Sequence, residues 1–473
     1  MADLKIKDIL DVLDNSLEIH QGAVRVSNPS RFREKVQKLA EVSALESREK
    51  QGLARYLTRA AALDLGIIPA SIHDLYMARG LGEVPPVFTV PAINLRALSF
   101  DAARVIFRVA KSMDASAFIF EIARSEIGYT DQRPAEYSTS VLAAAIAEDY
   151  KGPVFIQGDH FQVSAKRYGA NPDTEVQAVK DLIRESVAAG FFNIDVDTST
   201  LVDLNKPSVP AQQALNTELS AELTSYTRKI EPEGVTISVG GEIGEVGGRN
   251  STEEELRAYI EGFRKELDKR GAGMTGLSKI SIQTGTSHGG VVLPDGSIAK
   301  VKVDFDTLKR LSQIARRDYG MGGAVQHGAS TLPEDAFGKF VETEACEIHL
   351  ATGFMNMFFN CIPVDLREEM YAYLREKHAS EHKGDMTDEQ FYYKARKNAV
   401  GPFKARSWAL PLSVKENIKK DWESQFRKLF NVLGMAGTRQ YVEKFVKPVI
   451  IQPSIKDYLG EAAGVESLSD FAD

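Results

Sequence analysis

The stretch Ser281-Ile-Gln-Thr-Gly-Thr-Ser-His-Gly-Gly290 indicates the fold, because a short apolar run ends in a histidine surrounded by small residues. Ile280 and Ile282 give the run the β-branched character of a buried strand. The glycines around His288 allow the backbone to approach whatever the imidazole holds. We therefore interpret this stretch as a strand that ends in a functional site.

The same pattern occurs at three other places in the chain. Two of these runs are Val154-Phe-Ile-Gln-Gly-Asp-His160 and Val235-Thr-Ile-Ser-Val-Gly-Gly-Glu242, and the third is Ala324-Val-Gln-His-Gly-Ala-Ser330. The four predicted strand ends together carry three histidines, one aspartate and one glutamate.

Length and composition favour an ordinary globular protein. The chain has 473 residues, 43% hydrophobic and 26% charged, which allows a large core and excludes an intrinsically disordered protein. Its length suits one barrel with additions. A net charge of -8 argues against a non-specific nucleic-acid binder, although a local basic pocket for a phosphorylated metabolite remains possible.

Cysteine usage and the N-terminus predict a cytoplasmic protein. Cys346 and Cys361 are the two cysteines of the sequence, which is too few for a disulfide framework or a thiolate zinc site. The N-terminus lacks a basic segment followed by an apolar core, and no apolar run reaches the ~18 residues of a membrane span. We expect neither a membrane nor a nucleic acid among the partners.

Apolar strands alternate with amphipathic helices from residue 87 to about 362. Eight strands are predicted, at 87–94, 117–123, 154–160, 193–199, 235–242, 279–285, 323–327 and 345–351. The predicted helices follow at 100–113, 136–149, 175–189, 216–230, a segment capped by Ser251 or Thr252, 304–319, 333–343 and 354–377. Strict alternation predicts parallel strands, and eight units close naturally as a (β/α)8 TIM barrel. A doubly wound open sheet is the alternative, but a barrel better explains four polar strand ends that converge on one face.

Segments outside the barrel are predicted to be helical. We divide the chain into an N-terminal helical segment (1–83), the barrel (84–377) and a C-terminal helical extension with a tail (378–473). His20 and His73 are interpreted as surface or packing histidines. His378 and His382 have a spacing that on a helix could hold a metal, but a solvated charged segment is the preferred interpretation.

Three histidines on rigid strand ends predict a metal site. Neutral imidazoles of His160, His288 and His327 suit a borderline divalent ion and leave a fourth position open for substrate. Glu242 is either a further ligand or a carboxylate that orients a ligand histidine. Asp159 lies on the other side of its strand by the period of two, which favours an acid or base role over ligation. Its alternative role is to fix a histidine tautomer.

A phosphate site is predicted beside the metal. Gly289, Gly290, Gly328 and Ser330 supply backbone N–H groups and a hydroxyl, as a phosphate-binding nest does, or they merely form tight strand-to-helix turns. A Lewis-acid metal, a proton-transfer acid and a phosphate nest together indicate that an oxygen of a phosphorylated sugar is polarised.

Four motifs resemble those of the class II metal-dependent fructose-bisphosphate and tagatose-bisphosphate aldolases in order and spacing. These motifs are Asp159-His160, Gly241-Glu-Ile-Gly-Glu-Val-Gly-Gly248, Gly285-Thr-Ser-His-Gly289 and Gln326-His-Gly-Ala-Ser330. The resemblance covers residues 84–362, with a looser likeness at 413–447. Asn94 matches an asparagine of the family's first strand, and Asp197 and Ser199 match its fourth strand.

The resemblance implies a homo-oligomer that binds one Zn²⁺ per chain and stabilises the enediolate of dihydroxyacetone phosphate. It implies that the zinc ligands are His160, His288 and His327, with Glu242 associated with the metal. It implies that Asp159 exchanges the C4 hydroxyl proton. The C1 phosphate would be held by Gly289, Gly328 and Ser330, and we add Gly290 and Asn94 to the predicted substrate contacts.

The sequence also departs from the family pattern. Arg249-Asn250 follow where the family has a glutamate that deprotonates the ketone, and Gln157 replaces a histidine. On the eighth strand His349-Leu-Ala351 replaces Asn-x-Asp. The substitute base is predicted to be Glu245 or one of Glu253 to Glu255, with Glu121 as the next candidate, although Glu253 to Glu255 equally favour a helix N-terminus.

The prediction from sequence is a zinc-dependent aldolase that reversibly cleaves a phosphorylated ketose, with fructose 1,6-bisphosphate as the first candidate. The alternatives are an aldolase for another ketose phosphate, such as tagatose 1,6-bisphosphate, or a non-catalytic partner subunit of such an aldolase.

Overall fold

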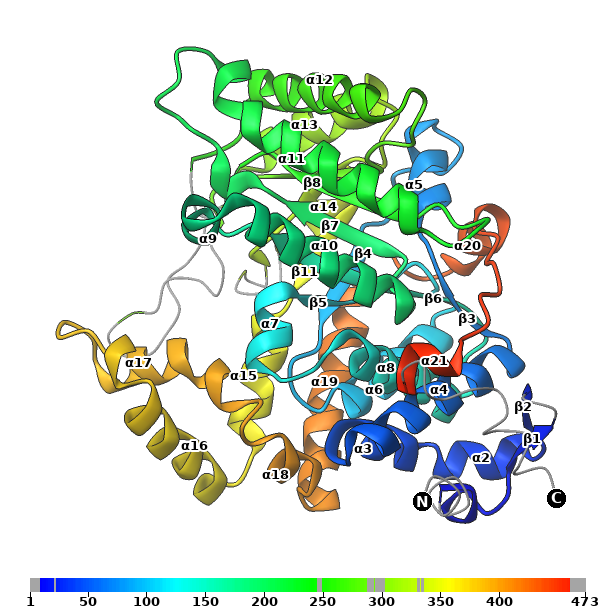
Figure 1. Ribbon diagram of the computed structural model, residues 1–473. Coiled ribbons are helices and arrows are strands. Elements are labelled where there is room, and N and C mark those ends of the chain that lie inside the picture. The colour runs from blue at the N-terminus through cyan, green and yellow to red at the C-terminus, as the bar shows by residue number, and fades with distance from the viewer. Residues whose placement is uncertain are drawn as a thin grey trace.

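A closed barrel of parallel strands forms the centre of the protein (Figure 1). The structure is a computed structural model that describes residues 9–20, 23–244, 249–286, 293, 303–329, 332 and 336–459. The barrel strands are β4 (Val90–Asn94), β5 (Ile119–Ala123), β6 (Gly152–Gln162), β7 (Asn193–Asp197), β8 (Ser238–Glu242), β9 (Lys279–Ile282), β10 (Ala324–Gln326) and β11 (Glu347–Leu350). All neighbouring pairs are parallel, and β11 pairs with β4 to close the ring. The predicted TIM barrel is confirmed, and the open sheet is excluded.

Helices on the outside of the barrel connect successive strands. They include α6 (Ser99–Ser112), α8 (Pro134–Ala147), α10 (Pro172–Ala188), α11 (Val209–Ile230), α12 (Glu253–Arg270), α13 (Phe305–Arg317), α14 (Gly338–Glu342) and α15 (Thr352–Cys361). Short helices α7 (Arg124–Tyr129) and α9 (Ala165–Ala170) follow β5 and β6. The helix predicted at 354–377 is two helices, because Pro363 separates α15 from α16 (Val364–Lys377) and cannot continue a helix.

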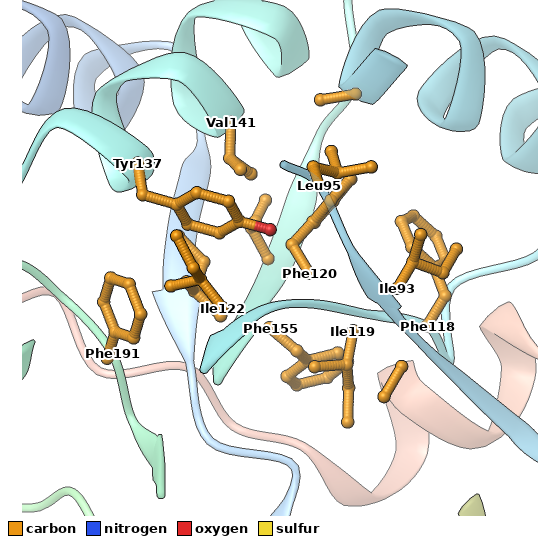
Figure 2. Close-up of a cluster of buried hydrophobic side chains, with 14 of the residues drawn as sticks. Ile93, Leu95, Phe118, Ile119, Phe120, Ile122, Tyr137, Val141, Phe155 and Phe191 are labelled. Atoms are coloured by element: carbon orange, nitrogen blue, oxygen red, sulfur yellow. The ribbon is translucent and has the colours of Figure 1, made fainter. Parts of the chain in front are cut away.

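Large apolar side chains fill the layer between the strands and the helices. Figure 2 shows one part of this core, where side chains of β4, β5 and β6 meet those of α8. The hydroxyl of Tyr137 donates to the carbonyl of Glu121 at 2.6 Å, so that this buried polar group is satisfied. The labelled residues are all buried: Ile93, Leu95, Phe118, Ile119, Phe120, Ile122, Tyr137, Val141, Phe155 and Phe191.

A ninth parallel strand, β3 (Ile67–Ala70), joins the barrel sheet from the N-terminal segment. It pairs with the first half of β6, from Gly152 to Phe155, and β7 pairs with the second half from Gln157 onward. Asn193, the first residue of β7, forms hydrogen bonds with both β3 and β6. Its amide donates to the carbonyls of Ala70 (3.2 Å) and Ile156 (3.0 Å), and its carbonyl oxygen accepts from the Ile72 N–H (2.9 Å).

Asn193→Ala is expected to lower the free energy of unfolding by about 3 kcal/mol, because it leaves buried backbone groups without partners. Denaturant titration measures the change. Asn205→Ala is a matched control, since Asn205 bonds only within an exposed turn with Asp203. Equal stability of the two variants would show that the three contacts of Asn193 contribute little.

The segment before residue 84 contains strands that the sequence did not predict. Strands β1 (Leu17–His20) and β2 (Ala23–Val26) form an antiparallel pair, followed by helices α2 (Pro29–Lys35), α3 (Gln37–Leu45), α4 (Arg48–Asp64) and α5 (His73–Gly80). Burial lowers the pKa of His73 to about 4, so this side chain is a neutral packing residue.

The C-terminal segment continues as a series of helices that pack on different parts of the protein. Helices α17 (Asp388–Ala395), α18 (Lys404–Trp408), α19 (Leu412–Val432), α20 (Arg439–Phe445) and α21 (Ile455–Leu459) follow α16. Trp422 is buried and donates to the carbonyl of Phe354 at 3.3 Å, which fixes α19 against α15. None of the described helices is long and apolar enough to cross a membrane.

His378 and His382 do not share a helix face. Helix α16 ends at Lys377, before either histidine. His378 Nδ1 lies 2.8 Å from Glu381, whereas His382 Nε2 lies 3.2 Å from Asp388. The two side chains have separate carboxylate partners at the surface, as the preferred interpretation expected.

Candidate metal and catalytic site

Five predicted site residues lie together at the C-terminal ends of the barrel strands. Asp159 and His160 lie near the end of β6, Glu242 ends β8, His327 follows β10, and Asn94 ends β4. This convergence follows from the barrel, which brings the carboxyl ends of all its strands to one face. Of the other predicted residues, Gly328 is described, whereas His288, Gly289, Gly290 and Ser330 lie outside the described residues.

His160, Glu242 and His327 form a group with metal-ligand spacing. One potential ligand atom from each lies within 4.8 Å of the others, and the ring centroids of the two histidines are 4.1 Å apart. Two imidazoles and a carboxylate are a donor set that suits zinc. The structure therefore brings together every predicted metal ligand that it describes.

Asp197 orients His160 from the outer side. Its Oδ2 lies 3.1 Å from His160 Nδ1, and Glu242 Oε2 lies 3.0 Å from the same nitrogen. The carboxylate of Asp197 is itself fixed by the backbone N–H and hydroxyl of Ser199 (3.0 and 2.7 Å) and by the amide of Gln162 (2.7 Å). Two carboxylates therefore hold the Nδ1 edge of the ring and fix its orientation, while Nε2 faces Asp159.

A bulge in β6 turns both Asp159 and His160 into the site. Strict alternation predicts opposite sides, but the pairing of β6 with β7 shifts register between Gly158 and Phe161, and His160 has a φ of 40°. His160 Nε2 consequently lies 3.8 Å from Asp159 Oδ1. The sequence argument for separate sides was wrong, because one residue in the left-handed conformation interrupts the alternation.

Asp159 is buried and held from two sides. Its Oδ2 accepts from Asn94 Nδ2 at 3.0 Å, and its Oδ1 lies 3.1 Å from His349 Nδ1. Burial alone would raise the pKa of Asp159, but His160 and His349 hold that pKa well below its usual range. Asp159 is therefore a carboxylate at neutral pH, in the form that accepts a proton.

Asn94 also bonds a second carboxylate. Its Nδ2 donates to Glu126 Oε2 at 2.7 Å, and Glu126 in turn accepts from Arg96 Nε at 2.6 Å. This chain links Asp159 through Asn94 to Arg96 at the rim of the barrel. The observed role of Asn94 is to position the acid, while its contact with a substrate stays a prediction.

The carboxylates of the site respond differently to their surroundings. Burial, and after it the charge of Asp197, raises the pKa of Glu242 to about 7. Burial would also raise the pKa of Asp197, but its hydrogen bond with His160 and its other bonds lower it. Glu242 therefore changes protonation near neutral pH while Asp197 stays ionised.

A layer of charged residues beneath the site was missed by the sequence analysis. It consists of Asp195, Lys279, Glu347 and His349, all buried and all on barrel strands. His349 was noted only as a departure from a family pattern, yet its ring centroid lies 4.0 Å from that of His327. A signal was present, because ionised residues inside apolar strand runs require buried partners.

Glu121 belongs to this interior layer. Its Oε2 accepts from Gln157 Nε2 at 2.8 Å, and its Oε1 lies 3.1 Å from His349 Nδ1. Burial and the nearby charge of Asp159 raise the pKa of Glu121 from 4.5 to about 8. The folded protein therefore holds this proton at neutral pH, when the unfolded chain has lost it.

The stability of the metal-free protein is expected to depend on Glu121. Between about pH 4.5 and 8 the folded chain binds the Glu121 proton and the unfolded chain does not, so Glu121 lowers stability as pH rises through this window. Glu121→Gln does not titrate at this position. The melting temperature of the variant minus that of wild type is therefore expected to increase by several degrees from pH 5 to pH 8. Thermal unfolding of both chelator-treated proteins at the two pH values measures this gain, and a constant difference would contradict it.

Two of the candidate bases near Arg249-Asn250, where the family has a glutamate, are bonded to groups of helix α12 or its cap. Glu255 accepts from the Thr252 N–H (2.8 Å) and hydroxyl (3.0 Å) in a capping box at the start of α12. Glu253 pairs with Arg257 at 2.9 Å along the same helix. Glu254 is exposed on that turn, and Glu245 lies outside the described residues. The helix-capping interpretation therefore holds for Glu255.

The turn after His327 has the conformation that a nest needs. Gly328 has a φ of 69°, in the left-handed region that favours glycine. Thr286 donates to the carbonyl of His327 at 2.7 Å and fixes the same turn. This geometry is compatible with a bound phosphate and equally with a tight turn alone.

The charge balance of the barrel interior fits a bound cation. Among the described residues of this cluster, six buried carboxyl groups share the barrel interior with one buried lysine, Lys279, and Glu121 is the one of the six that keeps its proton at neutral pH. Burial would lower the pKa of His160, but Asp159 and Glu242 raise it well above the usual value, so a metal ion at this ring would displace a proton. The six are Glu121, Asp159, Asp195, Asp197, Glu242 and Glu347.

Comparisons with known proteins give a family and a fold. The family model for class-II fructose-bisphosphate aldolase matches residues 87–438. A probable tagatose 6 phosphate kinase from Sinorhizobium meliloti has a TM-score of 0.51 at 15% identity over 81% of this chain and 97% of its own. A putative fructose-1,6-biphosphate aldolase from Coccidioides immitis has a TM-score of 0.47 at 17% identity, over 78% of this chain and 97% of its own. The first of these structures shows the shared fold alone.

Proposed function

The chain belongs to the class II fructose-bisphosphate aldolase family, and from this membership we propose that it is a zinc-dependent aldolase for a phosphorylated ketose. The proposed reaction reversibly splits the ketose, with fructose 1,6-bisphosphate as the first candidate, into dihydroxyacetone phosphate and an aldehyde. One observation carries the proposal: the ionised Asp159 lies directly beside the group of His160, Glu242 and His327.

Zinc is the proposed cofactor, with one ion per chain. We propose that His160, His327 and Glu242 hold it with His288, and that Asp197 fixes the orientation of the His160 ring. A zinc ion at these residues would supply Lewis-acid chemistry at a carbonyl or hydroxyl oxygen of the sugar. The surrounding carboxylates would keep the site selective for a cation.

Asp159 is the proposed proton carrier. A carboxylate held ionised by neighbouring imidazoles accepts the C4 hydroxyl proton as the carbon-carbon bond breaks and returns it in the reverse direction. Asn94 and His349 fix the orientation of the carboxylate, so little reorganisation is needed when the proton moves. Gly328, with Gly289, Gly290 and Ser330, is the proposed phosphate contact.

Cleavage assays with zinc-loaded protein test the proposal. Fructose 1,6-bisphosphate, tagatose 1,6-bisphosphate and the corresponding monophosphates form the substrate panel, and release of dihydroxyacetone phosphate is the measured signal. Turnover of one of these ketoses above the others supports the proposal and identifies the sugar. Absence of turnover with every member of the panel in metal-replete protein contradicts it.

A non-catalytic partner subunit is the second candidate. It is favoured by the contacts of two carboxylates in the first turn of α12. Glu253 pairs with Arg257 and Glu255 caps the helix, so neither is available as the base for a ketone. Solvent deuterium exchange into dihydroxyacetone phosphate separates the two candidates, because it requires a base but no aldehyde. Exchange that is lost in Glu245→Gln or Glu254→Gln identifies the base, whereas no exchange in wild type favours the partner subunit.

Oligomer formation is a further part of the proposal. The family resemblance supports a homo-oligomer. Light scattering of the purified protein measures the subunit number.

A further inference from the structure

Lys279 lies at the centre of the charged layer beneath the candidate site. Its side chain is 1% exposed, and its Nζ donates to Glu347 Oε1 at 2.5 Å and to Asp195 Oδ2 at 3.1 Å. Gln157 Oε1 accepts a third bond from the same nitrogen at 2.7 Å. All three donor positions of the ammonium group are therefore directed at named oxygens.

The backbone makes room for this arrangement at Gly240. A Cβ atom there would lie 2.3 Å from Asp195 Oδ1 and 2.8 Å from Lys279 Cε. Any larger residue on this part of β8 would displace the ion pair. The close approach therefore indicates that the position of Lys279 is built into the barrel.

Lys279 supplies a positive charge where the same layer has the spacing of a metal site. Glu121, Asp195, Glu347 and His349 have metal-ligand spacing. The ammonium group of Lys279 already contacts two of those carboxylates and supplies the positive charge among them. The layer contains a permanent internal cation.

His349 connects Lys279 to the catalytic carboxylate. Its Nε2 lies 2.7 Å from Glu347 Oε1, the same oxygen that contacts Lys279, and its Nδ1 lies 3.1 Å from Asp159 Oδ1. The imidazole is thus located between Glu347 on one side and Asp159, together with Glu121, on the other. The position of the ring depends on how much negative charge is left uncompensated on each side.

We propose that Lys279 is a positioning residue for Asp159, which it reaches through Glu347 and His349. By neutralising Glu347 and Asp195, Lys279 weakens their attraction for His349 and leaves the imidazole bonded to Asp159. Asn94 holds the other oxygen of Asp159, so the carboxylate is fixed from both sides. This inference rests on the proposed function in one respect, the role of Asp159 as proton carrier.

Loss of Lys279 redirects His349 toward the interior. Without the ammonium group, Glu347 and Asp195 carry two uncompensated charges next to His349 Nε2, which already lies 3.7 Å from Asp195 Oδ2. The ring then moves away from Asp159. Of its two contacts with Asn94 and His349, the carboxylate keeps only the one with Asn94. A displaced acid slows proton transfer without weakening the binding of the sugar phosphate.

The test compares Lys279→Met with the double variant Lys279→Met and Glu347→Gln. The single variant is expected to lose about 10- to 100-fold in kcat, with KM within about twofold and zinc content unchanged. The double variant removes the competing charge and is expected to recover most of kcat. Lys419→Met is the matched control. Lys419 is a buried lysine of α19, outside the barrel strands, and it is paired with Asp101 of α6 and Glu416 of α19. Its kcat is expected to equal that of wild type.

Crystal structures of the same variants give a readout that does not depend on activity. The contact between His349 Nδ1 and Asp159 Oδ1 is expected to be broken in Lys279→Met and restored in the double variant. This readout separates the two proposals, since it holds even if wild type cleaves no ketose phosphate. An intact contact in Lys279→Met, or an equal loss of kcat in the single and double variants, overturns the positioning role.

If Lys279→Met does not fold, Glu347→Gln alone continues the test. In this variant Lys279 neutralises Asp195, and no charge on residue 347 competes for His349. The contact between His349 and Asp159 is therefore expected to persist, and kcat is expected to stay within about threefold of wild type. Loss of the contact in Glu347→Gln overturns the proposal, because it would show that Glu347 holds His349 in place and does not compete for it.

Discussion

Replacing Asp159 by alanine is expected to lower kcat for ketose phosphate cleavage by about 10²- to 10⁴-fold, the usual range for removal of a general acid or base. The reason is that Asp159 is ionised, buried and adjacent to the proposed metal ligands. Zinc content is expected to stay at about one ion per chain, because the ligand group of His160, Glu242 and His327 does not include this carboxylate. Steady-state kinetics and elemental analysis of the same sample measure both quantities.

Asp159→Asn separates proton transfer from packing. The amide fills the same volume beside Asn94 and His349 but carries no transferable proton at neutral pH. A loss of kcat equal to that of Asp159→Ala is therefore expected. Loss of zinc together with activity in either variant would make Asp159 a ligand and would contradict its assignment, since it also lies in a group with His327 and His349 that has metal-ligand spacing.

Replacing His327 by alanine is expected to remove most of the bound zinc and to reduce cleavage to the background rate. Among the described residues, His327 is shared by two of the three groups with metal-ligand spacing, the one with His160 and Glu242 and the one with Asp159 and His349. Its loss removes one of the four proposed ligands and weakens the tetrahedral coordination that zinc prefers. Elemental analysis after gel filtration measures the metal content of wild type and variant.

His378→Ala is the control for His327→Ala. His378 is a surface histidine paired with Glu381, far along the chain from the barrel strands, so full metal content is expected. His288→Ala extends the series to the third predicted ligand. Retention of stoichiometric zinc in His327→Ala would remove this residue from the ligand set and place the ion elsewhere.

Much of the barrel could be predicted from the sequence because its strands are buried on both faces. Such strands form continuous apolar runs, and each of the eight predicted runs overlaps an observed barrel strand. The strands of the N-terminal segment were missed for a physical reason. They are four residues long, and β3 includes Pro69, which indicates a turn in a sequence pattern.

The site was predictable only where it depended on strand ends. The convergence of Asp159, His160, Glu242 and His327 follows from the barrel alone. The orientation of His160 depends on a bulge, and the partners of Asp159 depend on His349 and Lys279, which lie on other strands. Such contacts are set by the register between strands, and a single sequence does not specify that register.

The insertion of β3 beside β6 has a consequence for how the chain folds. Parallel partners need long connections, and β3 must wait for β6 to follow it in the chain before its backbone groups find their hydrogen bonds. Until then both strands present free edges that pair readily with other chains. A shortened chain that begins after β3 would keep the edge of β6 exposed permanently, so we expect it to aggregate during synthesis and to depend on chaperones, although every predicted site residue is present.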